Sequence, residues 1–265
     1  MEGIIDFHAH AFPDALAGRA IKVLEQEGGV KAHLDGRVSS LLSSMDKSGI
    51  EKSVVCSIAT KPAQFDPILT WSKKIRSERI IPIPSVHPDD PRCLERISQL
   101  KGEGFKGVKL HPYYQNFYID DEKLFPLYEE MCEHNLLLVL HTGFDIAFPP
   151  IRRADPEQIL YVREHFPTMR LITTHLGSWK LWAEVEKSLI GKQVYMEISM
   201  SLEFMGREEA RKLLLNHDKN YILFGTDSPW TGQKETIELL KGLHLGTDLE
   251  RLILRDNSIN LLGAE

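Results

Sequence analysis

Five side chains of types that bind divalent metal ions stand where apolar, strand-like segments of the sequence end. They are His8, His10, His141, His175 and Asp227. Imidazoles and a carboxylate suit zinc or a similar first-row ion, and a site with an open coordination position binds water and lowers its pKa toward neutrality. A carboxylate or a non-ligating histidine beside the ion can accept the water's proton and return it to a leaving group. His175 and Asp227 are the candidates for this catalytic role.

Each of these signals has an ordinary explanation when it is taken alone. With 11 histidines in 265 residues, a His-X-His pair such as His8 and His10 arises by chance roughly 0.4 times. Asp227 could simply cap the turn that follows its strand. The recurrence of such residues at four separate strand ends is what favours a metal-assisted enzyme.

The segments that must position these residues alternate between two patterns. Eight short apolar runs are separated by longer stretches of helical periodicity with plausible caps at their ends. Strands that are apolar nearly throughout predict a parallel sheet covered by helices, and eight is the number in a (β/α)8 TIM barrel. An open doubly wound sheet is the alternative, but no glycine-rich phosphate loop follows the first strand. The predicted strands are 4–9, 51–59, 79–86, 105–111, 136–142, 170–175, 193–199 and 221–227.

Side-chain alternation gives a further prediction about the face that each strand presents. If His8 and His10 point into the barrel, Ile4 and Asp6 share their face, because residues two apart on a strand point the same way. On four other strands the same rule places a pair of residues together: Lys109 with His111, Val139 with His141, Thr173 with His175, and Gly225 with Asp227. The polar residues then lie at the carboxyl ends of the strands, where barrel enzymes carry their active sites.

Composition narrows the class of protein and its partners. The chain is 42% hydrophobic and 26% charged, and no apolar run approaches the roughly eighteen residues that a membrane span needs. We expect a soluble globular protein with no membrane partner, and the lack of a signal-peptide pattern after Met1 favours the cytoplasm. The net charge of −6 and the pI near 6.0 argue against a nucleic-acid partner.

Cysteine usage and the absence of a linker bear on domain organisation. Cys56, Cys93 and Cys132 lie far apart without a CxxC pattern, which indicates neither a disulfide framework nor a thiolate zinc site. No Gly/Ser-rich or Pro-rich linker interrupts the chain, so residues 1–265 are expected to form one domain. A homodimer is the base-rate expectation for the assembly.

The motifs, read in order, resemble a known enzyme family. DFHAHAFPD, GVKLHP, LVLHTG, TTHLG and LFGTDSPW, followed by ILRDNSINLLG, look like the amidohydrolase superfamily. The resemblance is to the amidohydrolase-2 branch in particular, which includes aminocarboxymuconate-semialdehyde decarboxylase, and it spans Ile5 to Gly263. It implies a distorted (β/α)8 barrel. It also implies four metal ligands, His8, His10, His141 and Asp227, with His175 beside them as an acid/base or polarising residue.

The fourth predicted strand leaves the number of metal ions open. In some branches of the superfamily a carbamylated lysine on this strand bridges two ions, and Lys109 stands there in GVKLHP. In the decarboxylase-like branch one ion suffices, and Lys109 and His111 could then bind an anionic group of the substrate. His175 is a further candidate for a substrate contact or a second-metal ligand. We favour one divalent ion, with zinc as the first candidate. TatD-like nucleases typically place Glu where Lys109 stands, which weakens a DNase interpretation.

Several other residues are candidates for the surroundings of the site. Asp6, Thr142, Thr174 or Ser228 could orient the histidines, whereas strand register cannot decide whether Glu197 faces the pocket or the helices. Four loop arginines could hold a substrate carboxylate: Arg19, Arg37, Arg152 and Arg153. Six aromatic residues could form an apolar wall around a planar substrate: Phe12, Tyr113, Tyr114, Phe144, Phe148 and Trp230.

Three functions from different classes follow from these observations. The first is a metal-dependent hydrolase of a small molecule with an amide, ester or lactone bond. The alternative is a metal-dependent non-oxidative decarboxylase of an unsaturated or aromatic carboxylic acid, which uses the same ligands. The third is a catalytically inactive binding barrel that keeps the fold without turnover.

Overall fold

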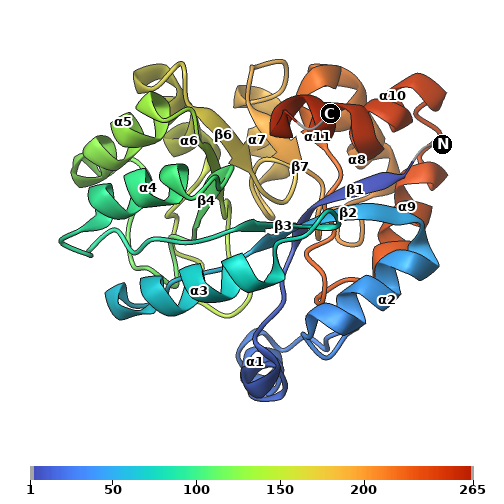
Figure 1. The fold of residues 1–265 in the computed structure, drawn as a ribbon. Coiled ribbons are helices and arrows are strands. Elements are labelled where there is room, and N and C mark those ends of the chain that lie inside the picture. The colour runs from blue at the N-terminus through green and yellow to red at the C-terminus, as the bar shows by residue number, and fades with distance from the viewer. Residues whose placement is uncertain (1–2, 264–265) are drawn as a thin grey trace.

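The computed structural model describes residues 3–263, which contain eight parallel strands that alternate with helices along the chain (Figure 1). The strands are β1 (Ile4–Ala9), β2 (Ile50–Cys56), β3 (Ile80–Ile83), β4 (Gly107–Leu110), β5 (Leu137–Leu140), β6 (Arg170–Thr173), β7 (Tyr195–Glu197) and β8 (Ile222–Leu223). Each of them overlaps one of the eight strands that the apolar pattern predicts. β1 has the bounds of its predicted run, and the other strands are shorter than theirs. On β4, β5, β6 and β8 the pairing stops before His111, His141, His175 and Asp227.

Helices fill the connections between the strands and form the outer layer. The α-helices are α1 (Asp14–Gly28), α2 (Val38–Ser48), α3 (Phe65–Ile75), α4 (Cys93–Gly102), α5 (Phe125–Glu133), α6 (Pro156–His165), α7 (Trp182–Ser188), α8 (Arg207–Asn216), α9 (Gln233–Gly242), α10 (Thr247–Arg251) and α11 (Asn257–Leu262). Short turns of other helix types are η1 (Pro62–Gln64), η2 (Glu122–Leu124), η3 (Lys219–Tyr221) and the π-helical η4 (Leu252–Asp256). No helix between residues 3 and 263 is long and apolar enough to cross a membrane.

Local sequence explains where these helices begin. The segment Asp155–Gln158 is a capping box at the start of α6, in which the Asp155 carboxylate accepts from the Gln158 N–H and the Gln158 side chain accepts from the Asp155 N–H, each at 3.0 Å. Pro156 occupies the first helical position, where its missing N–H costs nothing.

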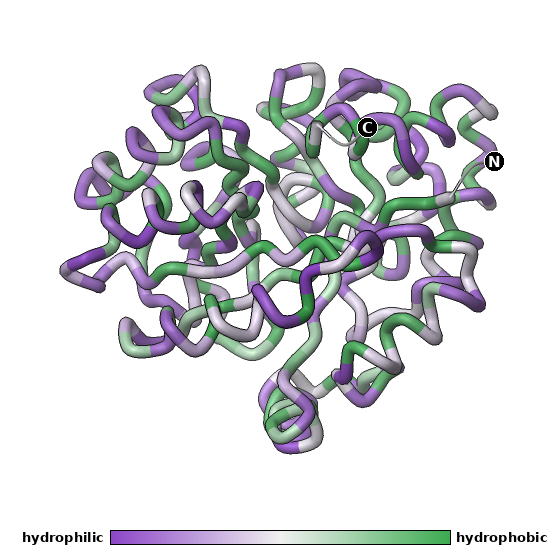
Figure 2. Tube along the Cα trace, in the orientation of Figure 1, coloured by the Kyte–Doolittle hydropathy of each residue, from purple (hydrophilic) through white to green (hydrophobic). Residues whose placement is uncertain are grey.

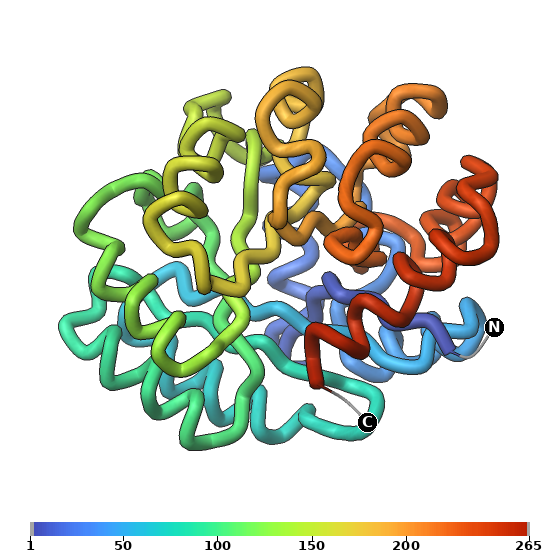
Figure 3. The backbone as a smooth tube through the Cα atoms, turned by 90° about the horizontal axis from the view of Figure 1, so that it is seen from above, coloured from blue at the N-terminus to red at the C-terminus, as the bar shows by residue number. Residues whose placement is uncertain are grey.

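The strands form two hydrogen-bonded sheets that meet at two seams. One sheet has the order β1-β2-β3 and the other the order β4-β5-β6-β7-β8. At the first seam, Lys109 N donates to Pro84 O at 2.8 Å, and at the second, Phe7 N donates to Phe224 O at 2.7 Å. The strands therefore follow one another around a (β/α)8 barrel. Figure 3 shows the helical segments encircling it in chain order, from cyan through green, yellow and orange to red.

Apolar side chains pack on both faces of the strands. An inner cluster joins residues of opposite strands, such as Ile5 of β1 and Val139 of β5, and includes Leu261 and Leu262 of α11. A larger cluster lies between the strands and the helices. In Figure 2 hydrophobic colour runs along the strands, whereas the helices alternate between hydrophobic and hydrophilic segments. Burial on both faces is what requires the nearly continuous apolar runs in the sequence.

The prediction that Ile4 shares the inward face of His8 and His10 is wrong. Ile4 packs in the outer cluster, whereas Ile5 and Phe7 pack in the inner one. The pairing of β1 with β2 shifts its register between Asp6 and Ala9, and such an irregularity changes which face the following residues present. The rule holds on β4, where Lys109 pairs in register with Val139 of the inner cluster.

Candidate functional site

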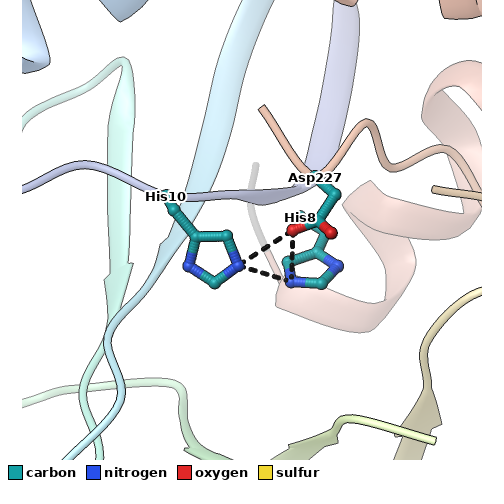
Figure 4. A group of neighbouring side chains, drawn as sticks. All are labelled: His8, His10 and Asp227. Carbon is teal, nitrogen blue, oxygen red and sulfur yellow. Dashed lines mark hydrogen bonds and ion pairs between the residues drawn. The ribbon is translucent and has the colours of Figure 1, made fainter. Parts of the chain in front are cut away.

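Three side chains from the two ends of the chain converge at the carboxyl end of the barrel (Figure 4). The Nε2 atoms of His8 and His10 lie 3.1 Å apart. Oδ1 of Asp227 lies 2.9 Å from Nε2 of His10 and 3.5 Å from Nε2 of His8. His8 and Asp227 are buried, and His10 is partly buried. Donor atoms bound to one tetrahedral zinc ion at about 2.0 Å lie about 3.3 Å from one another, so these separations fit a shared metal ion.

The hydrogen-bond partners of the two rings establish which nitrogens carry protons. Nδ1 of His8 lies 3.0 Å from Oε1 of Glu197, and Nδ1 of His10 lies 2.8 Å from the carbonyl oxygen of Cys56. Carboxylate and carbonyl oxygens only accept, so each Nδ1 carries a proton, and in the neutral form of each ring Nε2 carries a lone pair. Three electron-pair donors thus face one point, and a cation is what such an arrangement binds.

The backbone holds Asp227 and His175 in the left-handed region, beyond the ends of their strands. Asp227 has φ 59°, and its N–H donates to the carbonyl of His8 at 2.7 Å. His175 has φ 57° and is followed by Leu176 at φ 51°. Non-glycine residues adopt this region at a cost, and such residues concentrate at functional sites where the surrounding contacts hold them.

His175 and His141 lie together beside this group. Nε2 of His175 is 3.2 Å from Nδ1 of His141, and Nδ1 of His175 is 3.1 Å from the carbonyl oxygen of Ser199. Nε2 of His141 lies 3.2 Å from the carbonyl oxygen of Phe144. The structure therefore brings His8, His10 and Asp227 together and places His141 against His175.

Lys109 and His111 both lie next to these histidines. The Lys109 side chain is 1% exposed, and its Nζ lies 3.4 Å from Nε2 of His8. The His111 ring stacks on the His141 ring with centroids 4.0 Å apart. Oδ2 of Asp145 lies 3.4 Å from Nε2 of His111 and 3.7 Å from Nε2 of His141, which makes a second group that could hold a metal ion. Asp145 was not predicted from the sequence, because it lies in a loop, four residues after His141.

Burial and charge together set the protonation of these groups. Burial raises the pKa of Asp227, but its histidine neighbours outweigh that effect and bring the pKa to about 2. Burial lowers the pKa of His8, His111 and His141 well below its ordinary value, and nearby cations, Lys109 among them, lower it further. Burial also lowers the pKa of Lys109, against the opposing effect of Cys56, Asp227 and Glu197. His8, His111 and His141 are thus neutral and the Asp227 carboxylate is ionised near pH 7, as metal ligands must be.

A cavity of about 390 Å³ opens above the site, with walls that are mostly apolar. Lys109 is its one Lys or Arg lining residue in the described part of the chain. The loop arginines Arg19, Arg37, Arg152 and Arg153 do not line it. Of the six predicted aromatic wall residues, four line it: Phe12, Tyr114, Phe144 and Trp230. Trp71 of α3 and Trp179 add to this wall and were not predicted, because nothing in the sequence locates α3 over the barrel mouth.

The acceptors expected to orient the histidines are different from those observed. Glu197 and Cys56 O hold the rings of His8 and His10. Asp6 instead accepts from Thr226 and Gln233. The Thr142 hydroxyl donates to the carbonyl of Thr174 at 2.8 Å, within the wall of the barrel.

Comparison with solved structures shows the fold. The chain is similar to an uncharacterised TIM-barrel protein from Bordetella bronchiseptica, with a TM-score of 0.80, 20% identity and 98% of each chain covered. It is similar to 2,6-dihydroxybenzoate decarboxylase from Rhizobium, with a TM-score of 0.72, 15% identity and 99% of each chain covered. A 5-carboxyvanillate decarboxylase from Novosphingobium aromaticivorans, solved with bound manganese, gives a TM-score of 0.71 at 12% identity, with 98% of this chain and 97% of that one covered.

The sequence comparison shows the family. No curated protein matches the chain. The family model described as amidohydrolase, of the amidohydrolase-2 type, matches residues 5–264, which is nearly the whole chain. Its members are metal-dependent enzymes, and the converging histidines and carboxylate described above could hold such a metal. The protein belongs to the amidohydrolase family, in its amidohydrolase-2 branch.

Proposed function

We propose that the protein is a metal-dependent hydrolase of a small molecule that carries an amide, ester or lactone bond. The observation that carries this proposal is that Nε2 of His8, Nε2 of His10 and Oδ1 of Asp227 lie close together. The Nδ1 atoms of the two rings are hydrogen-bonded to Glu197 and to the carbonyl of Cys56. The apolar cavity above this point accommodates a small molecule.

One divalent ion, with zinc as the first candidate, is proposed at this point. His8, His10 and Asp227 would hold it, and His141 is the candidate for a fourth ligand. When bound, the ion would polarise a substrate carbonyl and lower the pKa of a water molecule. A second ion is the alternative, either through carbamylation of Lys109 or at the group formed by His111, His141 and Asp145.

The residues of the chain supply the remaining chemistry. The Asp227 carboxylate, ionised near pH 7, accepts a proton from the attacking water and delivers it to the leaving group. The His175 ring lies with its centroid 5.8 Å from that of His8, and its Nδ1 faces the carbonyl oxygen of Ser199. In its doubly protonated form it would donate from Nε2 and stabilise the negative charge that develops on the substrate oxygen. Apolar walls keep bulk water away, which strengthens both interactions.

Non-oxidative decarboxylation is the second candidate, and the composition of the cavity favours it. Lys109 is buried, stands at the cavity floor and would attract a carboxylate, while the flanking aromatic walls would exclude water from that carboxylate. Loss of carbon dioxide disperses charge, so an apolar environment favours it. The similar structures from Rhizobium and Novosphingobium aromaticivorans are decarboxylases of aromatic acids.

One assay distinguishes these functions. The zinc-loaded or manganese-loaded protein is incubated with a panel of lactones, esters, amides and arylcarboxylates, and both hydrolysis and carbon dioxide release are measured. Hydrolysis of one class supports the first proposal, whereas carbon dioxide release without hydrolysis replaces it with the second. Less than about a tenth of an equivalent of bound metal, not restored by adding zinc or manganese, would support an inactive binding barrel.

A further inference from the structure

Glu197, at the end of β7, accepts hydrogen bonds from four donors although its side chain is fully buried. Its Oε1 accepts from Nδ1 of His8 at 3.0 Å, from the N–H of His175 at 3.0 Å and from the hydroxyl of Ser199 at 2.8 Å. Its Oε2 accepts from the N–H of Ser199 at 2.7 Å. Two of these donors are backbone N–H groups, which can only donate, and one faces each oxygen, so the two oxygens are both placed as acceptors.

The contact with His8 determines which ring nitrogen can bind a metal. Because Glu197 accepts a hydrogen bond from the N–H at Nδ1, the neutral ring carries its lone pair on Nε2, which faces His10 and Asp227. A carboxylate behind a ligating histidine also makes the ring a stronger donor. The orientation and the tautomer of His8 are therefore set by Glu197.

The contact with His175 controls a different part of the site. His175 and Leu176 both have positive φ, and both of their N–H groups donate to Glu197, one to the side chain and one to the carbonyl oxygen at 2.7 Å. These bonds hold a turn that would otherwise relax to a lower-energy conformation. The same carboxylate thus sets the position of His175, the residue proposed to stabilise the developing negative charge.

Space for this arrangement comes from the neighbouring strand. A Cβ atom at Gly225 would overlap Oε2 of Glu197 and come within 3.1 Å of Cβ of His8. A residue with a side chain at this position would push the carboxylate away from its donors. Gly225, just after β8, is thus the position that permits Glu197 to reach past β8 to His8 of β1.

We infer that Glu197 is a positioning residue that couples the metal ligand His8 to His175 through a single carboxylate. This inference rests on the proposed metal-dependent function. It goes beyond that function because it assigns the selection of the His8 tautomer, and the support of the His175 turn, to a residue that need not touch metal or substrate.

The test compares zinc affinity in metal-free wild-type protein and in Glu197→Gln by calorimetric titration. The substitution keeps the shape but loses the charge and turns an amide N–H₂ toward one of the donors. We expect zinc affinity to fall roughly 10- to 100-fold, the usual effect of losing such a partner. Glu130→Gln is the matched control, because Glu130 also pairs with a histidine, His134 at 2.9 Å, but on the outer helix α5. Its zinc affinity should equal that of the wild type.

Two further readouts keep the outcome clear. Thermal melting of both metal-free variants shows whether the fold is retained, and nitrogen-15 NMR of labelled histidines in the metal-free wild type reports the tautomer of His8 directly. Zinc affinity of Glu197→Gln within twofold of the wild type, or a proton on Nε2 of His8 in the wild type, would overturn the inference. A wild type that binds no zinc would instead contradict the proposed function, and the NMR result would still decide the role of Glu197.

Discussion

His8 and His10 face each other through their Nε2 atoms at 3.1 Å, although both rings are held from behind by acceptors. Two lone pairs at this distance repel each other unless a positive charge lies between them or beside them. Asp227 adds a third donor atom 2.9 Å from His10. The Lys109 ammonium supplies one such charge, 3.4 Å from Nε2 of His8. The proposed metal ion, held by the three donor atoms, would supply a second, and the following expectations derive from that proposal.

Removing one donor should abolish metal binding without unfolding the barrel. Asp227→Asn suits this test because asparagine tolerates the left-handed φ of 59° that position 227 adopts. His8→Ala removes a donor from the first strand. Because both residues lie at the rim rather than in the packed layers, we expect less than about a tenth of an equivalent of bound metal together with cooperative melting. Metal analysis and calorimetry check this, and loss of the melting transition would contradict it.

Metal should stabilise the folded protein by an amount that depends on its concentration. If the ion binds only the folded state, a free concentration of 100 times the dissociation constant adds about 2.7 kcal/mol to the free energy of unfolding. The melting temperature should therefore fall on treatment with a chelator and recover when zinc or manganese is returned. A melting temperature that changes neither on chelation nor on return of the metal would count against a bound ion.

Stability of the metal-free protein should fall as the pH drops below 6.5. Burial holds the pKa of His8, His111 and His141 well below the ordinary 6.5, so above this pH both the folded and the unfolded states are neutral at these rings. Below it only the unfolded chain takes up protons, and each ring then removes up to about 1.4 kcal/mol of stability per pH unit.

One carboxyl opposes this trend. Burial raises the pKa of Asp6 to about 6, so between its ordinary value of 3.8 and pH 6 the folded state holds more protons there than the unfolded state does. The window from pH 6.5 down to 6 is therefore the most informative. Denaturant titrations across it should show stability decreasing, and His111→Asn should make this decrease shallower. A flat profile in the wild type would show that these rings are not neutral when folded.

Gly225→Ala should reproduce part of the effect of losing Glu197. The added methyl group occupies the space that Oε2 of Glu197 fills, so the carboxylate must leave Nδ1 of His8. We expect weaker zinc binding in a barrel that still folds. Gly242→Ala is the control, because its added methyl meets nothing within 4 Å. Equal zinc affinity in both variants would mean that the carboxylate is not held as described.

Lys109 provides a test of the number of metal ions. With one ion we expect an unmodified ammonium that attracts an anionic substrate, so Lys109→Met should weaken binding of arylcarboxylates more than binding of the matching neutral amides. A carbamate would appear by carbon-13 NMR after reconstitution with labelled bicarbonate. Its detection together with two equivalents of metal would replace the one-ion proposal by the two-ion alternative.

The strands and the order of the site residues were predictable because both depend on local patterns. Apolar runs that are buried on both faces can be read directly from the sequence, and His8, His10, His141, His175 and Asp227 stand at their ends. The direction of side chains was less predictable. The alternation of side chains along a strand does not predict the register shift in β1 or the positive φ values beyond β6 and β8. Both depend on tertiary contacts.

Residues contributed by loops and by non-neighbouring strands were not predictable for a related reason. Glu197 reaches His8 only because β8 alone separates β7 from β1 and because Gly225, just after β8, leaves room. Asp145 and Trp179 lie in connections whose path depends on packing. A single sequence gives the residue types that can make such contacts, but it does not show which of those residues come close together in the fold.

The central claim is most directly tested by a crystal structure of zinc-loaded protein with anomalous diffraction recorded at the zinc edge. The account predicts one strong peak at about 2.0–2.2 Å from Nε2 of His8, Nε2 of His10 and a carboxylate oxygen of Asp227. A zinc-loaded crystal with no peak between these three side chains, or with these side chains turned away from one another, would contradict it.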